Sequence, residues 1–356
     1  MKLNKKHQGK EFKSFFKFVG QVKQTITGTS DDFKVIPIYQ TTMTNPKDPD
    51  KKPKPRRVLR FDIFTNKFNN ISIQRAGMEF PKAQLYSSTD KKSAAIDWKD
   101  RFDKEKYPAK HYHMIETDWD FCARVADEIK ENDWVEVKGK YEFDKFVNEE
   151  GQEYPVIKRI ISSVEVIENE QEFKIGKNTI KYICDFEDPD FTEINYFNLE
   201  IGINSVYQDE ETKDTTINGI FLDYGKEKST PKEVKLICLY KEPENNKTAL
   251  ADAIAQMNKY DFIEFVGVDN NRPVFAEVED DTDSVDDLFS DVDEIVAKTR
   301  RVISGNKKGL EVTAVVNKTY QKQMLTEAEI GMTVEQQFNG VVVDDEDDIP
   351  FNLDDD

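Results

Sequence analysis

Basic and aromatic residues recur together in the first part of the chain, and this pairing suits the binding of a nucleic-acid strand. Segment 56–64, RRVLRFDIF, contains three arginines and ends in Phe64. A single strand offers a line of phosphates to basic groups and open base faces to aromatic rings. We therefore select one candidate set for nucleic-acid binding: Lys13, Phe16, Lys17, Arg57, Arg60, Phe64, Lys67, Phe68, Arg75, Tyr86, Trp98, Trp134, Lys138 and Phe146.

Each aromatic member of this set has an alternative role in a hydrophobic core. A Phe in a strand packs inside more often than it faces solvent. We expect Phe146 to be the exception and to be exposed, because it stands beside a turn and among charges in FDKFVNEEG. Trp134 is open to both interpretations. Val135 and Val137 would take the inner face of a strand, and alternation then sends Trp134 and Lys138 outward.

Catalytic and metal-binding patterns are weak in comparison. His111 and His113, followed by Cys122, could hold zinc, but no fourth ligand stands at a familiar spacing. The sequence has neither a phosphate-binding loop of the form G-x-x-x-x-G-K-[ST] nor a nucleophile elbow. We therefore expect a protein that is not an enzyme and needs no metal and no cofactor.

The segment VVVDDEDDIPFNLDDD, residues 341–356, combines carboxylates with a short apolar stretch. Its acidic residues cannot build a core, and their repulsion favours a largely disordered, extended strap. Such a strap can be a solubilising tail or a short motif that binds a partner. A purely solvated tail has no need of a Phe and an Ile, so we expect a partner-binding motif formed by Asp347, Asp348, Ile349, Pro350 and Phe351.

Charge is distributed unevenly along the 356 residues, whose formal net charge is -19. Residues 1–110 contain about 25 Lys and Arg against about 12 Asp and Glu, whereas residues 111–275 come to about -17 and residues 276–356 to about -15. A basic region and an acidic tail on one chain indicate a polyanion-binding part and a separate acidic part.

A helix–strand unit occurs twice in the sequence. Residues 121–139, FCARVADEIKENDWVEVKG, and residues 249–267, ALADAIAQMNKYDFIEFVG, both begin with the apolar spacing of a helix. Both then alternate as a strand of the form Asp, aromatic, β-branched, Glu, apolar, any residue, Gly. The final glycines, Gly139 and Gly267, suit a bulge or a bend at a barrel corner. We interpret the match as an internal duplication.

Strand-like segments surround both units. Those before the first unit are 14–27, 35–43, 56–64 and 71–80, and those before the second are 195–207, 217–225 and 233–240. A closing strand is predicted after each unit, at 154–168 and at 273–280. Several short strands, one helix and a last hairpin are typical of the OB-fold, a five-stranded Greek-key barrel. The alternative is a pair of other small α+β domains.

The predicted fold class is mainly β with short helices, as two tandem OB-fold-like barrels followed by an acidic, largely disordered C-terminal tail. The predicted parts are a basic OB-fold domain with long loops at 1–169, a second OB-fold-like domain at 170–280, an acidic helix and a weakly defined segment at 281–343, and the acidic tip at 344–356. Segment 44–57, TNPKDPDKKPKPRR, is too rich in Pro and Lys for a central strand, so we expect a long basic loop there.

The first unit and the tail together resemble the single-stranded-DNA-binding proteins of bacteria and phages. That family has a strand ending in Gly, an aromatic residue seven positions later and a Gly-Gln turn, which match Gly139, Phe146 and Gly151-Gln152. The segment DDEDDIPF resembles the acidic tip with which the family docks on replication and repair proteins. Here, however, NLDDD follows Phe351, the loops of the first barrel are longer, and the second hairpin, GVDNNRPVFAEV, has no aromatic residue that matches Phe146.

The resemblance implies a protein that coats single-stranded DNA with its N-terminal barrel and recruits replication, recombination or repair proteins through its tip. The unusual size and insertions favour a phage origin and the cytoplasm of a bacterial host. Three scattered cysteines, an N-terminus without an apolar segment and the lack of any apolar run of membrane-spanning length agree with a cytoplasmic location. Two alternatives are an OB-fold scaffold for proteins that barely binds DNA and an acidic mimic of DNA.

Overall fold

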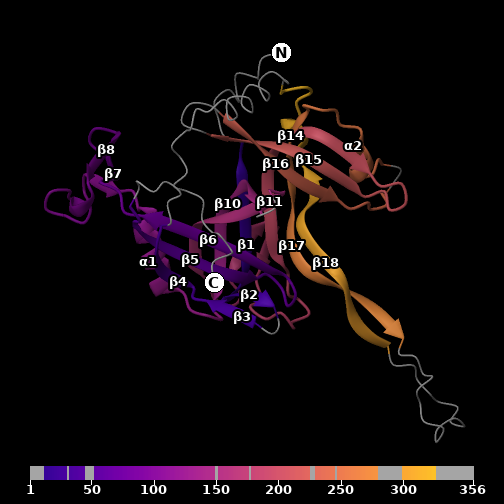
Figure 1. Ribbon diagram of the computed structural model, residues 1–356, viewed down its shortest axis with the longest axis horizontal. Coiled ribbons are helices and arrows are strands. Elements are labelled where there is room, and N and C mark those ends of the chain that lie inside the picture. The colour runs from indigo at the N-terminus through magenta and orange to yellow at the C-terminus, as the bar shows by residue number, and fades with distance from the viewer. Residues whose placement is uncertain are drawn as a thin grey trace, which may run out of the picture.

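The computed structural model describes residues 12–29, 32–44, 52–148, 151–175, 178–224, 229–244, 247–279 and 299–325. These residues are mainly β, and most of their strands join one 11-stranded sheet that closes into two barrels (Figure 1). The predicted fold class is confirmed in this respect. The predicted acidic tip at 344–356 lies outside the described residues.

The first barrel has five strands in the order of an OB-fold. Its strands are β1 (Ser14–Lys23), β5 (Pro55–Phe64), β6 (Asn70–Met78), β10 (Trp134–Val147) and β11 (Glu153–Val166). β1 pairs with β5 and β10, β5 pairs with β6, and β10 pairs with β11, all antiparallel. β11 runs parallel to β6 and closes the barrel. Helix α1 (Asp118–Glu128), whose first turn is capped by Thr117, precedes β10.

Two insertions enlarge the connections of this barrel. Between β1 and β5 lie the hairpin of β2 (Thr25–Thr29) and β3 (Asp32–Ile36) and the strand β4 (Tyr39–Met43), which pairs with β5. Between β6 and α1 lies a separate sheet of β7 (Lys82–Ser87), β8 (Lys92–Asp97) and β9 (Tyr112–Met114), with the 3-10 helix η1 (Trp98–Asp100). This sheet projects to one side of the barrel (Figure 1). The middle of the predicted basic loop, 45–51, lies outside the described residues.

The second barrel repeats the same strand order. Its elements are β14 (Ile194–Gln208), β15 (Thr215–Tyr224), β16 (Ser229–Cys238), helix α2 (Leu250–Ala255), β17 (Phe262–Glu279) and β18 (Thr299–Val315). β18 runs parallel to β16 and antiparallel to β17, as β11 does to β6 and β10. In the sequence, a small hairpin of β12 (Glu172–Ile175) and β13 (Asn178–Lys181) connects the last strand of the first barrel to the first strand of the second. The 3-10 helix η4 (Asn317–Thr319) follows β18.

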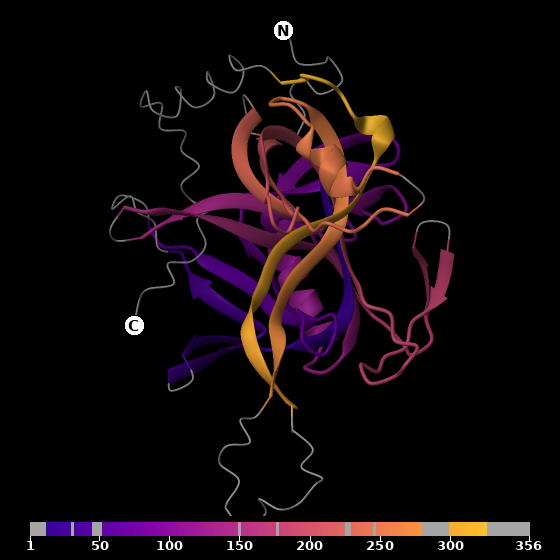
Figure 2. The ribbon, with the colours of Figure 1, turned by 90° about the vertical axis from the view of Figure 1, so that its right-hand side faces the viewer.

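The closing strand of the second barrel is not where the sequence analysis placed it. Residues 273–279 are the far half of β17, and they pair with residues 299–306 of β18. The long paired ribbon of β17 and β18 extends well beyond the barrels (Figure 2). The acidic helix was predicted within 281–343, but residues 280–298 connect the two strands of this hairpin and lie outside the described residues. The second barrel continues past residue 280 to Val315.

The predicted repeat of a helix followed by a barrel strand is confirmed. In both barrels the pairing shifts register at the final glycine, between Lys138 and Gly139 and between Val266 and Gly267. A Cβ at each glycine would collide with the partner strand and with an aromatic ring: at Gly139 it would lie 2.1 Å from the Ile160 carbonyl oxygen and 2.3 Å from the Phe16 ring, and at Gly267 it would lie 1.9 Å from the Glu311 carbonyl oxygen and 2.7 Å from the Phe197 ring. Only glycine leaves room for the partner strand and for these rings, which explains why the repeat ends in Gly.

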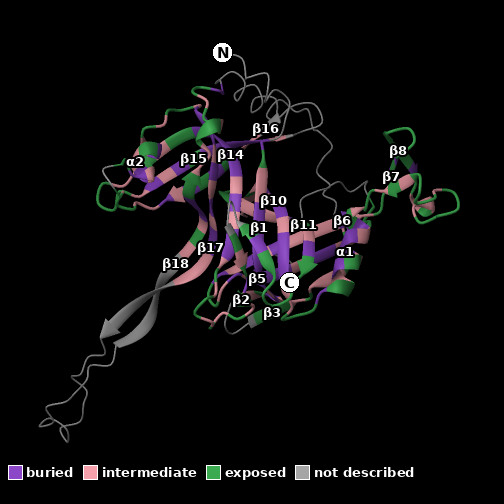
Figure 3. Ribbon diagram, turned by 180° about the vertical axis from the view of Figure 1, so that it is seen from behind, coloured by how far each residue is buried: buried purple, intermediate pink, exposed green. Residues whose placement is uncertain are grey.

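The first strands of the two barrels pair with each other and make one sheet of both. β1 and β14 are antiparallel, and Phe16 stands opposite Phe197 at the centre of the junction. A single core runs through both barrels along these central strands (Figure 3). Each barrel also brings its last hairpin against the other. The Phe143 ring of β10 lies 5.1 Å from the Phe221 ring of β15, and the Asn271 side chain of β17 donates a hydrogen bond of 2.6 Å to the Asn70 carbonyl oxygen.

A buried polar cluster fastens the two barrels at Asp269 of β17, which is fully buried. Arg159 of β11 donates two hydrogen bonds to its carboxylate, at 2.6 and 2.7 Å, and the Tyr141 hydroxyl of β10 donates a third at 2.9 Å. The Asp269 carbonyl oxygen accepts from the side-chain amides of Asn69 and Asn195. Because both oxygens of the carboxylate are satisfied by groups of the other barrel, the two barrels form one unit.

No helix among the residues that the structure describes is long and apolar enough to cross a membrane.

Candidate nucleic-acid interface

The outer face of β5 and β6 places a cation at the position where an OB-fold binds nucleic acid. Leu59, Phe61 and Ile63 of β5 are fully buried in the barrel, so alternation directs Arg60 and Phe64 to the outer face. Arg60 stands opposite Gln74 of β6, and Gln74 is paired with Ile160 of β11. Arg60 and Phe64 are both half-buried. Burial lowers the pKa of Arg60 and the nearby Asp62 partly offsets this, so the guanidinium remains a cation.

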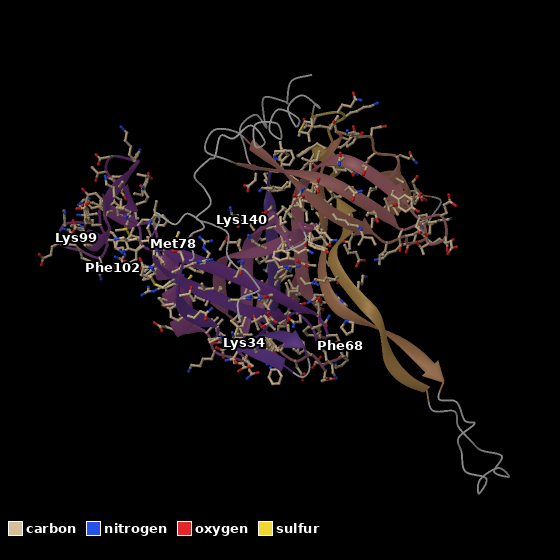
Figure 4. All side chains as sticks on the ribbon, in the orientation of Figure 1. Lys34, Phe68, Met78, Lys99, Phe102 and Lys140 are labelled. Carbon is tan, nitrogen blue, oxygen red and sulfur yellow. The ribbon has the colours of Figure 1, made fainter. Side chains whose placement is uncertain are left out.

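The β2–β3 hairpin borders this face and exposes apolar side chains that the candidate set missed. Phe33 is 62% exposed, and Ile26 and Val35, which pair across the hairpin, are exposed on the same face. The hairpin is tied to the barrel because the Thr25 hydroxyl donates a hydrogen bond of 2.8 Å to buried Asp62. Figure 4 shows Lys34 of this hairpin and Phe68 toward the same end of the barrel. The signal in the sequence was an unusual strand, DFKVI, which leaves apolar residues without a core to fill.

The end of the β10–β11 hairpin carries a pair of aromatic rings. Phe146 stands opposite Tyr154. We expected Phe146 to be exposed, and this expectation was wrong, because its side chain is half-buried. The exposed ring at this place is Tyr154, which is 48% exposed and donates a hydrogen bond of 2.6 Å to the Gln152 side chain. Tyr154 is therefore a second residue that the candidate set missed.

Two arginines of the candidate set hold α1 instead of facing outward. Arg57 donates a hydrogen bond of 3.1 Å to the Trp119 carbonyl oxygen and lies over the Trp119 ring at 4.2 Å. Arg75 pairs with Asp118 and donates a hydrogen bond of 2.8 Å to the Ile161 carbonyl oxygen. Both arginines occupy inward-directed positions of their strands, at the barrel end that α1 closes. Their assignment to nucleic-acid binding is corrected: they position the helix.

Phe16 and Lys17 also belong to the interior. Phe16 is fully buried and stacks on Phe18 with ring centroids 4.5 Å apart, so it cannot stack on a base. Lys17 is buried, pairs with Glu136 and lies 4.5 Å from the centroid of the Phe173 ring. Both assignments are corrected: Phe16 lies in the main core inside the barrel, and Lys17 lies on the other face of β1, which the segment around β12 and β13 covers.

The same covering segment accounts for Trp134, and a neighbour on its own strand accounts for Lys138. Trp134 points out of the barrel as predicted, but its ring packs on Tyr182 and Phe186, with centroids 5.9 and 4.6 Å apart. Lys138 is half-exposed and pairs with Glu136; this hydrogen bond is the main reason that the pKa of Lys138 is raised. Neither side chain is free to meet a strand of DNA in this arrangement.

The remaining candidates are scattered over the surface. Lys13 is exposed and lies 3.5 Å from a Glu200 carboxylate oxygen. Lys67 pairs with Glu187, beside the exposed Phe68. The Trp98 ring is covered by Arg101 at 4.2 Å, and Tyr86 is exposed on the projecting sheet. The structure therefore keeps Arg60, Phe64 and Phe68 on or beside the outer face of β5 and β6 and places the others elsewhere.

No metal centre is present among the residues that the structure describes, since no three His, Cys, Asp or Glu side chains are grouped to hold an ion. His111 and His113 are exposed, whereas Cys122 is fully buried on the side of α1 that faces the core. Burial raises the pKa of the Cys122 thiol to about 11, which keeps it protonated at neutral pH. The zinc alternative thus has no support in the geometry.

Comparison with known proteins gives a family and two distantly similar solved structures. A model of the YorF family, described by that name alone, matches residues 70–346. No curated protein matches the chain. Among solved structures, the wild-type single-stranded DNA binding protein from Thermus aquaticus is similar at 9% identity and a TM-score of 0.33, over 76% of this chain and 98% of that one. A deletion mutant of the same protein with one substitution is similar at 9% identity and a TM-score of 0.33, over 73% of this chain and 88% of that one.

Proposed function

We propose that this chain, which belongs to the YorF family, binds single-stranded DNA through the outer face of its first barrel. One observation carries the proposal: the row that crosses the β5–β6–β11 face consists of Arg60, Gln74 and Ile160. The guanidinium and the amide are suited to a phosphate and a base edge, and Ile160 leaves the row without a carboxylate.

The same row of the second barrel has different chemistry. The matching pairings across β15, β16 and β18 join Thr216, Ile237 and Glu311. Glu311 is buried and accepts hydrogen bonds from Asn270 and Lys307, at 2.8 and 2.7 Å. A hydroxyl therefore replaces the cation, and a carboxylate replaces the isoleucine. The first barrel is thus the barrel equipped for a polyanion, and the second barrel supports it through the shared sheet.

Binding would combine phosphate contacts with base stacking. Arg60 would neutralise a phosphate, which makes the affinity fall as salt rises because counterions are released. Phe33 and Tyr154 offer exposed rings on the two loops that border an OB-fold's binding face, and bases stack on such rings with little dependence on sequence. This combination favours a single strand over a duplex, whose bases are already stacked on each other.

We propose a separate role for the tip, Asp347, Asp348, Ile349, Pro350 and Phe351, in recruiting replication, recombination or repair proteins. Its support is the sequence alone, since these residues lie outside the described residues. Five consecutive carboxylates at 344–348 precede the apolar pair of Ile349 and Phe351. Such a segment finds a basic groove by charge and holds it with an apolar anchor, while Pro350 limits the conformations lost on binding.

A fluorescence titration of the full chain with oligo-dT, at two salt concentrations and beside a duplex of the same length, tests DNA binding. We expect oligo-dT to bind more tightly than duplex, with an affinity that falls as salt rises. Equal affinity for the duplex, or no binding at low salt, would reject the proposal. The scaffold for protein partners would then be the better interpretation.

A further inference from the structure

The sheet of β7, β8 and β9 has one face packed on its own small core and one face open to solvent. Ala83, Leu85 and Ile96 are buried and pack with Tyr107 and Met114 on the inner side. Alternation along β7 directs Lys82, Gln84 and Tyr86 to the opposite side, where all three are exposed. The insertion is therefore a folded module with one exposed sheet face.

Tyr86 stands at the centre of this face. Its cross-strand neighbours are Ser93 of β8 and His113 of β9, and in the next row Gln84 stands opposite Ala95. Ser93, Ala95 and His113 are exposed, and Tyr86 is 39% exposed. Cross-strand neighbours on one face lie within contact of each other, so the Tyr86 and His113 rings form an adjacent pair. The serine and the alanine beside them are too small to cover the rings.

The charge of the module suits an anionic ligand. On the open face Lys82 stands opposite the exposed Asp97 of β8, whereas within the described residues no ion pair holds Lys91 and Lys92 at the turn between β7 and β8. The cations that do have partners are those that hold the module together or anchor it: Lys106 pairs with Asp100, and Arg101 pairs with Asp120.

The module is fastened to the first barrel. Arg101 donates two hydrogen bonds to Asp120 in the first turn of α1, at 2.8 and 3.1 Å, and both side chains are largely buried. Arg101 also donates a hydrogen bond of 2.9 Å to the Trp98 carbonyl oxygen. A platform held in this way loses little conformational freedom when a ligand binds.

From these observations we propose that the open face of the β7–β8–β9 sheet is a second contact surface for single-stranded nucleic acid, on which bases stack over Tyr86 and His113. Gln84 can hydrogen-bond a base edge, and Lys91 and Lys92 at the β7–β8 turn can meet phosphates. Aromatic residues at the centre of an open sheet face are an effective stacking platform for unpaired bases. The inference rests on the proposed function, because the nucleic acid that reaches this module would be the same molecule that is bound on the face of the first barrel.

Two lengths of oligo-dT separate the two surfaces. An oligonucleotide of about 10 nucleotides is within the range that one OB-fold covers, whereas one of about 40 nucleotides extends beyond it. In the full chain, Tyr86→Ala should lower the affinity for the long oligonucleotide by about fivefold or more, since one base loses its stacking partner. Its affinity for the short oligonucleotide should not change. Tyr86→Phe should keep both affinities, because the ring remains.

Phe102→Ala is the matched control, since Phe102 is an aromatic residue of the same module that is 67% exposed but does not lie on this sheet face. Phe102→Ala should change neither affinity. Equal loss with Phe102→Ala and Tyr86→Ala, or no loss with Tyr86→Ala on the long oligonucleotide, would overturn the inference and leave the face to a protein partner. If the parent protein binds the short oligonucleotide, the proposed function stands whatever the two variants do. If the parent binds neither length, both the proposed function and the second contact surface are rejected.

Discussion

The two barrels share one strand order, yet their corresponding connections have opposite chemistry. In the first barrel the connection from β1 to β5 is long, and its segment 44–57 contains six Lys and Arg against two Asp. In the second barrel the connection from β14 to β15 is the short segment DEETKD, residues 209–214. Hydrogen bonds from the backbone of Thr212 and Glu211 lower the pKa of Asp209 there, so this carboxylate stays charged.

The connections in the last hairpins also differ, because the one in the second barrel is longer and contains more carboxylates. The turn between β10 and β11 is the short segment NEEGQ, residues 148–152, whereas the segment between β17 and β18, residues 280–298, contains eight Asp and Glu against one Lys. The duplication placed equivalent connections at equivalent positions, and these connections differ in charge. A fold determines where the binding loops lie, and their side chains determine what binds there.

The largest effect should come from breaking the polar cluster that joins the barrels. Arg159→Met leaves the Asp269 carboxylate buried without its charge partner and should lower the free energy of unfolding by about 3–5 kcal/mol. Denaturant unfolding measures this change. If the barrels are one unit, the parent should unfold in a single transition and the variant at a lower denaturant concentration.

Lys67→Met is the matched control, because Lys67 also pairs across the chain, with Glu187, but both side chains are exposed. Exposed ion pairs contribute about 0–1 kcal/mol, so this variant should stay close to the parent. Equal destabilisation by the two substitutions would show that burial of the pair has no special importance, and that the barrels are joined by the shared sheet alone.

A smaller effect is expected from removing one stacking ring of the first barrel. Phe33→Ala should weaken single-strand binding by about 1–3 kcal/mol, because the exposed ring can stack on one base. Tyr207→Ala is the control: Tyr207 is 61% exposed on β14 of the second barrel. Titration with oligo-dT should detect a loss only for Phe33→Ala. A comparable loss for Tyr207→Ala would mean that the second barrel also contacts the strand, against the difference drawn above.

Reversing one charge on the central row should have an effect of about tenfold. Arg60→Glu replaces a phosphate partner with a carboxylate, so binding should weaken and the slope of log affinity against log salt should flatten by about 1. Thr216→Glu places a carboxylate at the matching position of the second barrel and should have little effect. Equal responses of the two variants in titrations at several salt concentrations would argue that the strand lies across both barrels.

The sequence predicted those features that depend on local periodicity. The two helix–strand units, the glycines at the bulges and the OB-fold order follow from patterns within a few tens of residues. The closing strand of the second barrel was misplaced because residues 280–298 separate β17 from β18, and the apolar alternation at 273–279 looked like a complete strand. A long insertion in a hairpin hides the partner of a strand from any local pattern.

The binding site was less predictable because burial is set by distant parts of the chain. Trp134 does point out of the barrel, as alternation required. Its ring is nevertheless covered by Tyr182 and Phe186, which lie 48 and 52 positions later in the sequence. Arg57 and Arg75 look like phosphate ligands in sequence, yet the ring of Trp119 and the carboxylate of Asp118 occupy them. Cation–π and ion-pair partners of this kind are visible only when the helix is docked on the barrel.

The smallest effect on DNA binding is expected from the acidic tip, which shares its negative charge with the connections of the second barrel. Deleting residues 344–356 should leave the affinity for oligo-dT unchanged or slightly tighter, because a polyanion that competes for the first barrel is removed. Phe351→Ala should leave that affinity unchanged, since it keeps every charge. A pull-down from host extract should separate the two roles: it should retain partner proteins with the parent and lose them with Phe351→Ala, because the apolar anchor is gone. If the same proteins are retained with Phe351→Ala, the tip acts only through its charge, and the acidic connections of the second barrel become the stronger candidates for partner contact.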